Sequence, residues 1–189
     1  MGRLRQRGYD LSVAVNLGPA DLLDLGLPSE VERLLGHHRI SAEHLEVEVS
    51  EEIVMADVDR TVDVLAGLRA IGVRTALDDF GAGHAGLGHL KHLHVDVLKI
   101  DRSFVMRVVQ DERDAAIVHS LVDLARRLGV RVVAEGVDSP EGCALLAEWG
   151  CDEVQGHYLA RPMPASDLEQ WLRQPDPLNR GRRTRHRYP

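Results

Sequence analysis

The chain repeats one pattern six times: a short run rich in Val and Leu, a polar residue near its end, and then a helical stretch. The predicted strands are 12–16, 45–48, 73–77, 95–100, 130–134 and 153–155. The predicted helices are a stretch reaching about 35 that is broken near 26–28, then 58–71, 87–93, 111–128, 139–149 and 165–172. Strands that alternate with helices indicate a parallel sheet with right-handed crossovers. An open doubly wound sheet and a (β/α)₈ barrel both satisfy this pattern.

The residues at the strand ends favour the barrel. No G-x-x-x-x-G-K-[ST] motif follows a predicted strand, so the sign of a P-loop nucleotide-binding sheet is missing. Polar side chains stand instead at six successive strand ends, and in barrels these ends meet at one mouth. They are Asn16, Glu48, Asp78 with Asp79, Lys99, Glu135 and Gln155. A complete barrel has eight units and about 250 residues. We therefore predict an incomplete TIM-type (β/α)₈ barrel of about six βα units, with the shortage before residue 12.

Two adjacent carboxylates, Asp78 and Asp79, follow the third predicted strand and precede Gly81 and Gly83. Neighbouring side chains in a regular strand point to opposite faces. At a strand end that enters a glycine turn this alternation is expected to break, and both carboxylates can then turn toward one point. Carboxylates that close repel each other unless a cation lies between them. Taken alone, the pair fits equally a turn in which one Asp caps a helix and the other is solvated.

Charge limits the classes of partner. The formal net charge is −7, although residues 174–189 hold five arginines against one aspartate, so the body of the chain is still more acidic. An acidic body does not suit duplex nucleic acid, which needs a basic face, but it suits divalent cations that carry an anionic ligand. We predict an N-terminal extension at 1–9, the barrel domain at 10–173 and a basic, disordered tail at 174–189.

No targeting or membrane segment is recognisable. No apolar run approaches 18 residues, and the start MGRLRQRGYD lacks the pattern of a signal peptide. The prediction is a cytoplasmic chain without a membrane span. Cys143 and Cys151 match no metal or redox spacing and are interpreted as buried thiols.

Five stretches resemble, in order, the EAL family of cyclic-di-GMP phosphodiesterases, which are (β/α)₈ barrels. They are VAVNLG, LEVEVSEE, ALDDFGAGHAGLGHLKHLHVDVLKIDRSFV, VVAEGVDSPEG and GCDEVQGHYLARPMP, and the resemblance covers about residues 10–173. The Glu-Ala-Leu tripeptide that defines the family occurs nowhere in the chain.

The resemblance implies a two-metal site for Mg²⁺ or Mn²⁺. One ion would be held by Asn16, Glu48 and Asp78, and the second would lie among Asp78, Asp79 and Glu135. Because the family glutamate of the Glu-Ala-Leu motif is missing, the first ion is expected to bind more weakly. The oxygen ligands agree with this choice of metal, since hard cations prefer them.

The resemblance also implies roles for the remaining site residues. Lys99 would orient or deprotonate the attacking water, Asp101 and Gln155 would help to seat the substrate, and Glu51 would brace the loop after Asp79. Because nearby anions favour a charged amine, we prefer Lys99 as a cation over a free base. The simpler alternative for Lys99 is a strand-end salt bridge to Asp101.

Three positions depart from the family pattern. They are Ser50 where Thr is usual, His84 where Tyr is usual and Ala85 where Ser is usual. The last two weaken the expectation of loop support and dimer coupling. Glu46 shares the strand face of Glu48 one layer deeper, and the sequence identifies no partner for it.

The predicted function is therefore an EAL-type phosphodiesterase domain that hydrolyses cyclic-di-GMP to linear pGpG, with the activity of this truncated chain in doubt. The alternative is a degenerate, non-catalytic module that binds cyclic-di-GMP or a partner protein. A different metal-dependent barrel, such as an aldolase, fits the ordered motifs less well. Open sheet edges further predict a homo-oligomer, or a partner segment that completes the barrel.

Overall fold

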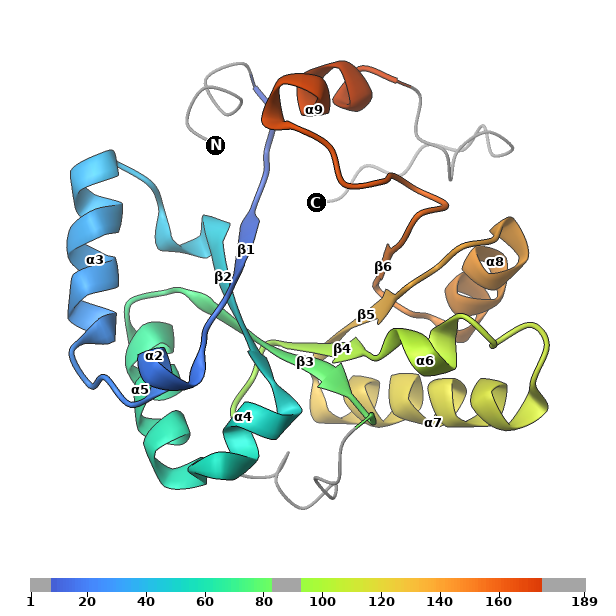
Figure 1. Ribbon diagram of the computed structural model, residues 1–189, viewed down its shortest axis with the longest axis horizontal. Helices are drawn as coiled ribbons and strands as arrows, with labels where there is room; N and C mark the ends of the chain where they lie inside the picture. The colour runs from blue at the N-terminus through green and yellow to red at the C-terminus, as the bar shows by residue number, and fades with distance from the viewer. Residues whose placement is uncertain (1–7, 83–92, 175–189) are drawn as a thin grey trace.

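The computed structural model describes residues 8–82 and 93–174. Six parallel strands form one sheet in chain order: β1 (Val13–Asn16), β2 (Leu45–Ser50), β3 (Arg74–Phe80), β4 (Val97–Ile100), β5 (Arg131–Glu135) and β6 (Glu153–Gln155). Every neighbouring pair is parallel. The sheet curves with its helices outside, and β1 and β6 are its edge strands (Figure 1). The prediction of an incomplete barrel is confirmed.

Helices between successive strands pack outside the sheet, whereas α9 follows the last strand and lies apart from the sheet (Figure 1). They are α2 (Pro19–Leu22), α3 (Leu27–His38), α4 (Glu51–Ala56), α5 (Val58–Ala70), α6 (Arg102–Val105), α7 (Glu112–Leu128), α8 (Pro140–Trp149) and α9 (Ala165–Leu172), with a 3₁₀ turn, η1 (Ala42–His44). None of these helices in the described residues is long and apolar enough to cross a bilayer. Helix ends follow local chemistry: Asp111 accepts from the backbone N–H of Arg113 at 2.9 Å to begin α7, and Gly129 ends it at φ 72°.

The two faces of the sheet are filled differently. Outward residues such as Val49, Leu77 and Leu98 are buried against the helices in the main core. The inner face carries a small separate cluster of Ala76, Val97 and Val133. These small side chains leave room for the long polar side chains that lie toward both ends of the strands on the same face. The site is formed by the polar side chains at the carboxyl ends.

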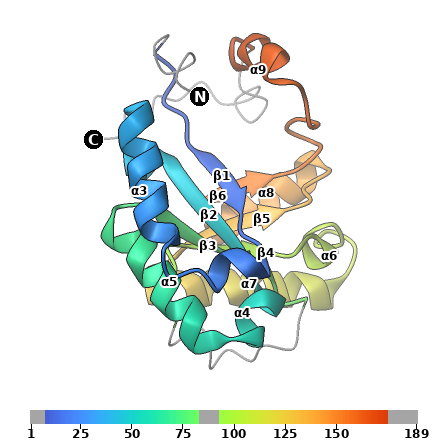
Figure 2. The same ribbon diagram turned by 60° about the vertical axis from the view of Figure 1, so that its left-hand side comes forward.

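Strand β1 is the exposed edge of this sheet. Its four residues are all exposed, with Val13 at 41% and Val15 at 45% (Figure 2 shows the edge from the side). Apolar side chains and unpaired backbone groups on one edge form a surface that another strand can extend.

Several observed strand and helix bounds differ from the predicted ones by one or two residues, and the following differences are larger. Strand β3 runs on to Phe80 instead of ending at Leu77. Helices α4 and α6 were not predicted. Each begins directly after a strand, with Ser50 or Asp101 as its N-cap, so no loop sequence separates the strand from the helix. The helix expected at 87–93 and the basic tail lie outside the described residues, apart from Leu93 and Gln174 at their borders.

Gly156, directly after β6, offers a test of how this fold holds its strand ends. A Cβ atom at Gly156 would lie 2.0 Å from the carbonyl oxygen of Val137 and 2.4 Å from its nitrogen, and backbone cannot move aside cheaply. We expect Gly156→Ala to lower the free energy of unfolding by about 2 kcal/mol or more, measured by urea denaturation.

Gly36, exposed within α3, is the matched control because a Cβ there meets nothing within 4 Å. Gly36→Ala should raise stability by about 0.5–1 kcal/mol, since alanine is the better helix former. Equal stability changes in the two variants would show that the Gly156 contact does not constrain the fold.

Candidate metal centre at the strand ends

The side chain of Lys99 on β4 forms the centre of the site. Its ammonium nitrogen lies 2.7 Å from Glu48 Oε1, 2.7 Å from Glu135 Oε1 and 3.0 Å from Asp78 Oδ1. The Lys99 side chain is only 5% exposed. Four successive strands, β2 to β5, therefore bring their carboxyl ends to one point, as the strand-end pattern predicted.

Asp78 and Asp79 reach the same space because β3 is irregular. The register with β4 shifts between Leu77 and Phe80, and Asp79 adopts φ 53°. Aspartate tolerates this left-handed conformation better than most residues. The predicted break in alternation is present, but it lies within the strand rather than at its end, since β3 continues to Phe80.

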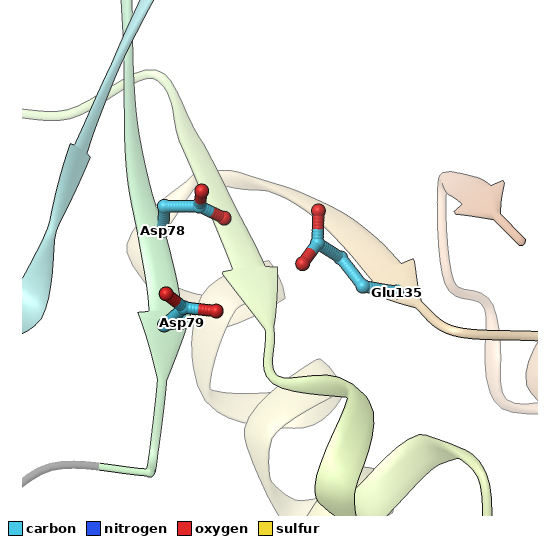
Figure 3. A group of neighbouring side chains, drawn as sticks. All are labelled: Asp78, Asp79 and Glu135. Carbon is cyan, nitrogen blue, oxygen red and sulfur yellow. The ribbon is translucent and has the colours of Figure 1, made fainter. Parts of the chain in front are cut away.

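Oxygen atoms of Asp78, Asp79 and Glu135 all lie within 4.8 Å of one another. Figure 3 shows the two β3 carboxylates and that of Glu135, which comes from β5, directed toward a shared space. Three carboxylates this close are held apart by repulsion unless cations or protons compensate them. This donor set of hard oxygen atoms fits Mg²⁺ or Mn²⁺.

Two further acids support this arrangement. Glu51, buried at the start of α4, accepts a hydrogen bond from the backbone N–H of Gly81 at 2.9 Å, which holds the chain just after Asp79. Asp101 accepts hydrogen bonds from the backbone N–H of Ser103 at 2.8 Å and from the Ser103 hydroxyl.

The alternative of a salt bridge between Lys99 and Asp101 is wrong, because the ammonium contacts Glu48, Asp78 and Glu135 instead.

Protonation follows from these contacts. Burial opposes charge on Lys99, but hydrogen bonds to Glu135, Glu48 and Asp78 outweigh it and raise the lysine pKa. Burial raises the pKa of Glu135 even though Lys99 acts in the opposite direction. Burial, together with the charges of Asp78 and Asp101, raises the pKa of Asp79. Lys99 is thus a cation throughout the neutral range, and the raised pKa values of Glu135 and Asp79 mean that these two carboxyl groups hold protons more readily than usual.

Asn16 and Gln155 lie at the two edges of the site. Asn16 pairs in register with Glu48, and Gln155 with Glu135, so each stands beside a carboxylate of the centre while remaining exposed. Gln155 and Glu135 also line a cavity of about 530 Å³. Arg102 and Arg161 line it too, and sequence reasoning missed both. Their only signal was that each lies inside a stretch that resembles the family, at KIDRSFV for Arg102 and at GHYLARPMP for Arg161.

The sequence model of the EAL domain matches residues 1–162. The chain belongs to the EAL domain family. Its half-barrel of parallel strands carries the carboxylates described above at the strand ends.

Known relatives agree with this assignment. The cyclic di-GMP phosphodiesterase NbdA of Pseudomonas aeruginosa is 40% identical over 163 residues, which is 86% of this chain and 21% of NbdA. The chain thus spans about a fifth of the length of the curated relatives it matches.

Two solved structures are similar throughout the described fold. The MucR phosphodiesterase in complex with c-di-GMP has a TM-score of 0.81 at 40% identity, covering 88% of this chain and 68% of that one. MucR also comes from Pseudomonas aeruginosa. The Klebsiella pneumoniae BlrP1 complex with manganese and cyclic-di-GMP has a TM-score of 0.78 at 32% identity, covering 85% and 41%.

Replacing Lys99 tests the charge balance. Lys99→Met should lower the free energy of unfolding by about 3–5 kcal/mol in metal-free neutral buffer, because it leaves buried carboxylates without their cation. The pKa of Glu135, already raised by burial, loses the hydrogen bond that restrains it and rises further. A carboxyl with a raised folded-state pKa favours folding at low pH and loses that contribution as pH rises through the folded value. The deficit should therefore shrink in mildly acidic buffer.

Urea unfolding at the two pH values measures this effect. Arg33→Met is the control, because Arg33 is 67% exposed and pairs with Glu30 only across 3.8 Å on the surface. Its effect should stay within about 0.5 kcal/mol at either pH. A Lys99→Met deficit that is independent of pH would contradict the proposed charge balance.

Proposed function

We propose that this chain forms the metal-binding face of a phosphodiesterase that opens cyclic-di-GMP to linear pGpG. The observation that supports this most is the convergence of Glu48, Asp78 and Glu135 on the Lys99 ammonium, with Asp79 beside them. Family membership and the names of the relatives NbdA and MucR point to the same reaction and substrate.

The residues divide into two ligand groups. Asn16, Glu48 and Asp78 would hold one Mg²⁺ or Mn²⁺, and Asp78, Asp79 and Glu135 the other. Two divalent ions bound in this way activate water and stabilise the attacking and leaving oxygens at phosphorus. The first group has only two anionic members, so the first site is the weaker one.

Lys99 would hold the attacking water and offset negative charge that develops on the phosphate. Its raised pKa argues against a free general base, because the amine keeps its proton at neutral pH. Glu51 acts as a positioning residue through the N–H of Gly81. Asp101 and Gln155 would contact the substrate, Gln155 from the wall of the cavity that it shares with Glu135.

A binding module without turnover is the second candidate. The absence of a Glu-Ala-Leu tripeptide favours it, since that glutamate would complete the weaker ligand group. The exposed position of Asn16 on edge strand β1 favours it as well. Both candidates require the metal, so metal binding tests them together and hydrolysis separates them.

Asp79→Asn is the test of the metal centre. It should weaken Mn²⁺ binding about tenfold, because one anionic ligand of the stronger group becomes neutral while its shape stays the same. Isothermal titration with Mn²⁺ measures this, followed by titration with cyclic-di-GMP in Mn²⁺ and in EDTA. Asp123→Asn, on the exposed side of α7, is the matched control and should change nothing. If the unaltered chain binds no metal, both candidates fail.

Hydrolysis should be slow for this chain alone. Small errors in placing reactive groups can cost about a hundredfold in rate, and the weaker ligand group has one anion fewer than the family pattern. We expect chromatography of pGpG to show at least about a hundredfold faster turnover when the chain is co-expressed with a segment that supplies two further βα units and a carboxylate. Fast turnover by the chain alone, lost in Asp79→Asn, would overturn the binding-module reading. No turnover in either form would favour it.

We also propose that the β1 edge joins a second copy or a segment that completes the barrel. Val15→Lys should weaken self-association measured by sedimentation velocity, because it places a charge on an apolar strand edge. Leu128→Lys, at an apolar position on α7 that is 53% exposed against 45% for Val15, is the control. A chain that is a monomer at all concentrations, with a sharp transition at high temperature, would contradict the proposal.

The domain boundaries and the cytoplasmic location stay predictions from the sequence.

A further inference from the structure

A second polar cavity lies at the opposite ends of the same strands. It measures about 820 Å³ and is lined by Arg69 from the end of α5, Arg74 from the start of β3 and Arg131 from the start of β5. The carboxylates of the metal centre stand at the carboxyl ends of β3 and β5, so the two sites are on different faces of the half-barrel. No motif in the sequence points to these arginines.

Arg69 is held rigidly at the wall of this arginine cavity. Its guanidinium donates to the carbonyl oxygen of His94 at 2.8 Å and to Asp96 Oδ1 at 3.1 Å. Asp96 is itself fixed, because its Oδ2 accepts from the backbone N–H of Thr75 at 2.9 Å. The Arg69 guanidinium is therefore placed before any ligand arrives.

Arg74 and Arg131 are incompletely hydrogen-bonded. Both lie near Glu46 Oε2, at 3.6 Å from Arg74 Nε and 3.7 Å from Arg131 Nη2, which is attraction without a good hydrogen bond. Arg74 Nε is buried and has no hydrogen-bond partner among the described residues. Each guanidinium has five N–H donors. Arg74 also donates to Ser12 Oγ at 2.5 Å, and Arg131 donates to Glu153 Oε1 at 2.8 Å.

An apolar recess continues the arginine cavity. A smaller cavity of about 190 Å³ shares Arg69, Leu93 and His94 with it and is closed by Val62 and Leu65. A charged wall with an apolar extension suits a ligand with an anionic group at one end and a flat or apolar group at the other. The arginine cavity, at about 820 Å³, falls in the range of small-molecule sites, which is about 300–1,000 Å³.

We propose that the arginine cavity binds an organic phosphate of nucleotide size, with its phosphate groups against Arg74 and Arg131 and its base toward the recess. Guanidinium groups match phosphate oxygens geometrically and make charge-assisted hydrogen bonds to them. Because Asp96, Glu46 and Glu153 balance the three arginines in charge, attraction comes from the exposed N–H groups of Arg74 and Arg131, whose side chains are 31% and 39% exposed, rather than from a net positive field. The proposal does not rest on the phosphodiesterase function.

The test uses the full chain in EDTA, so that the carboxylates at the opposite face hold no metal. Pyrophosphate, ADP and adenosine are titrated separately, with the Arg side-chain N–H signals followed by NMR. ADP should bind more tightly than pyrophosphate, adenosine should bind least, and the Arg74 signal should shift. Arg74→Gln and Arg131→Gln should each weaken ADP binding about tenfold or more, as expected for a lost charged hydrogen bond.

Two further variants keep the test decisive if Arg74→Gln does not fold. Arg74→Lys keeps the charge but loses the planar fork, so it should give a smaller loss than Arg131→Gln. Arg33→Gln, on the exposed face of α3, is the control and should bind ADP like the unaltered chain. Absence of ADP binding at millimolar concentration, equal binding of adenosine and ADP, or equal affinity in Arg131→Gln and the unaltered chain would each overturn the proposal. None of these outcomes alters the Mn²⁺ titration, so the two proposals fail independently.

Discussion

A buried ammonium that three carboxylates surround is the interaction on which this end of the sheet depends. Lys99 lies within 3.0 Å of Glu48, Asp78 and Glu135, each on a different strand. Charges buried in this way are stable only when compensated, so the lysine ties β2, β3 and β5 to β4 by electrostatics as well as by backbone hydrogen bonds. The same carboxylates are the proposed metal ligands. The protein therefore carries an internal cation where divalent ions are expected, and metal binding has to share the carboxylates with Lys99.

Both ends of the strands are polar, while the middle of the inner face is small and apolar. Ala76, Val97 and Val133 separate the metal centre from the arginines at the strand starts. Glu46 illustrates the division: it lies two residues before Glu48 on the same strand face, yet its neighbours are Arg74 and Arg131 rather than Lys99. One strand with alternating polar residues thus serves two distinct sets of partners.

The sequence predicted the order of strands and helices well, because hydrophobic runs and glycine stops are local signals. It also predicted which polar residues would gather at the mouth, since parallel strands share the direction of their ends. It could not predict the position of the irregularity in β3, which depends on register with β4 and not on any residue alone. The partners of Glu46 were equally out of reach, because Arg131 is far away in the chain and is brought near only by closure of the sheet. The choice of Glu48, Asp78 and Glu135 over Asp101 as partners of Lys99 likewise depends on side-chain geometry.

The left-handed backbone of Asp79 has a consequence for how the centre can be dissected. Asparagine occupies φ near 53° at least as readily as aspartate, but alanine and β-branched residues do not. An alanine at this position would favour a return of β3 to regular alternation, which would turn Asp78 away from Glu135. An alanine substitution of Asp79 would then remove two carboxylates from the centre, although the measured effect would be assigned to Asp79 alone. Shape and charge at this position can be separated only by a substitution that accepts the same backbone conformation.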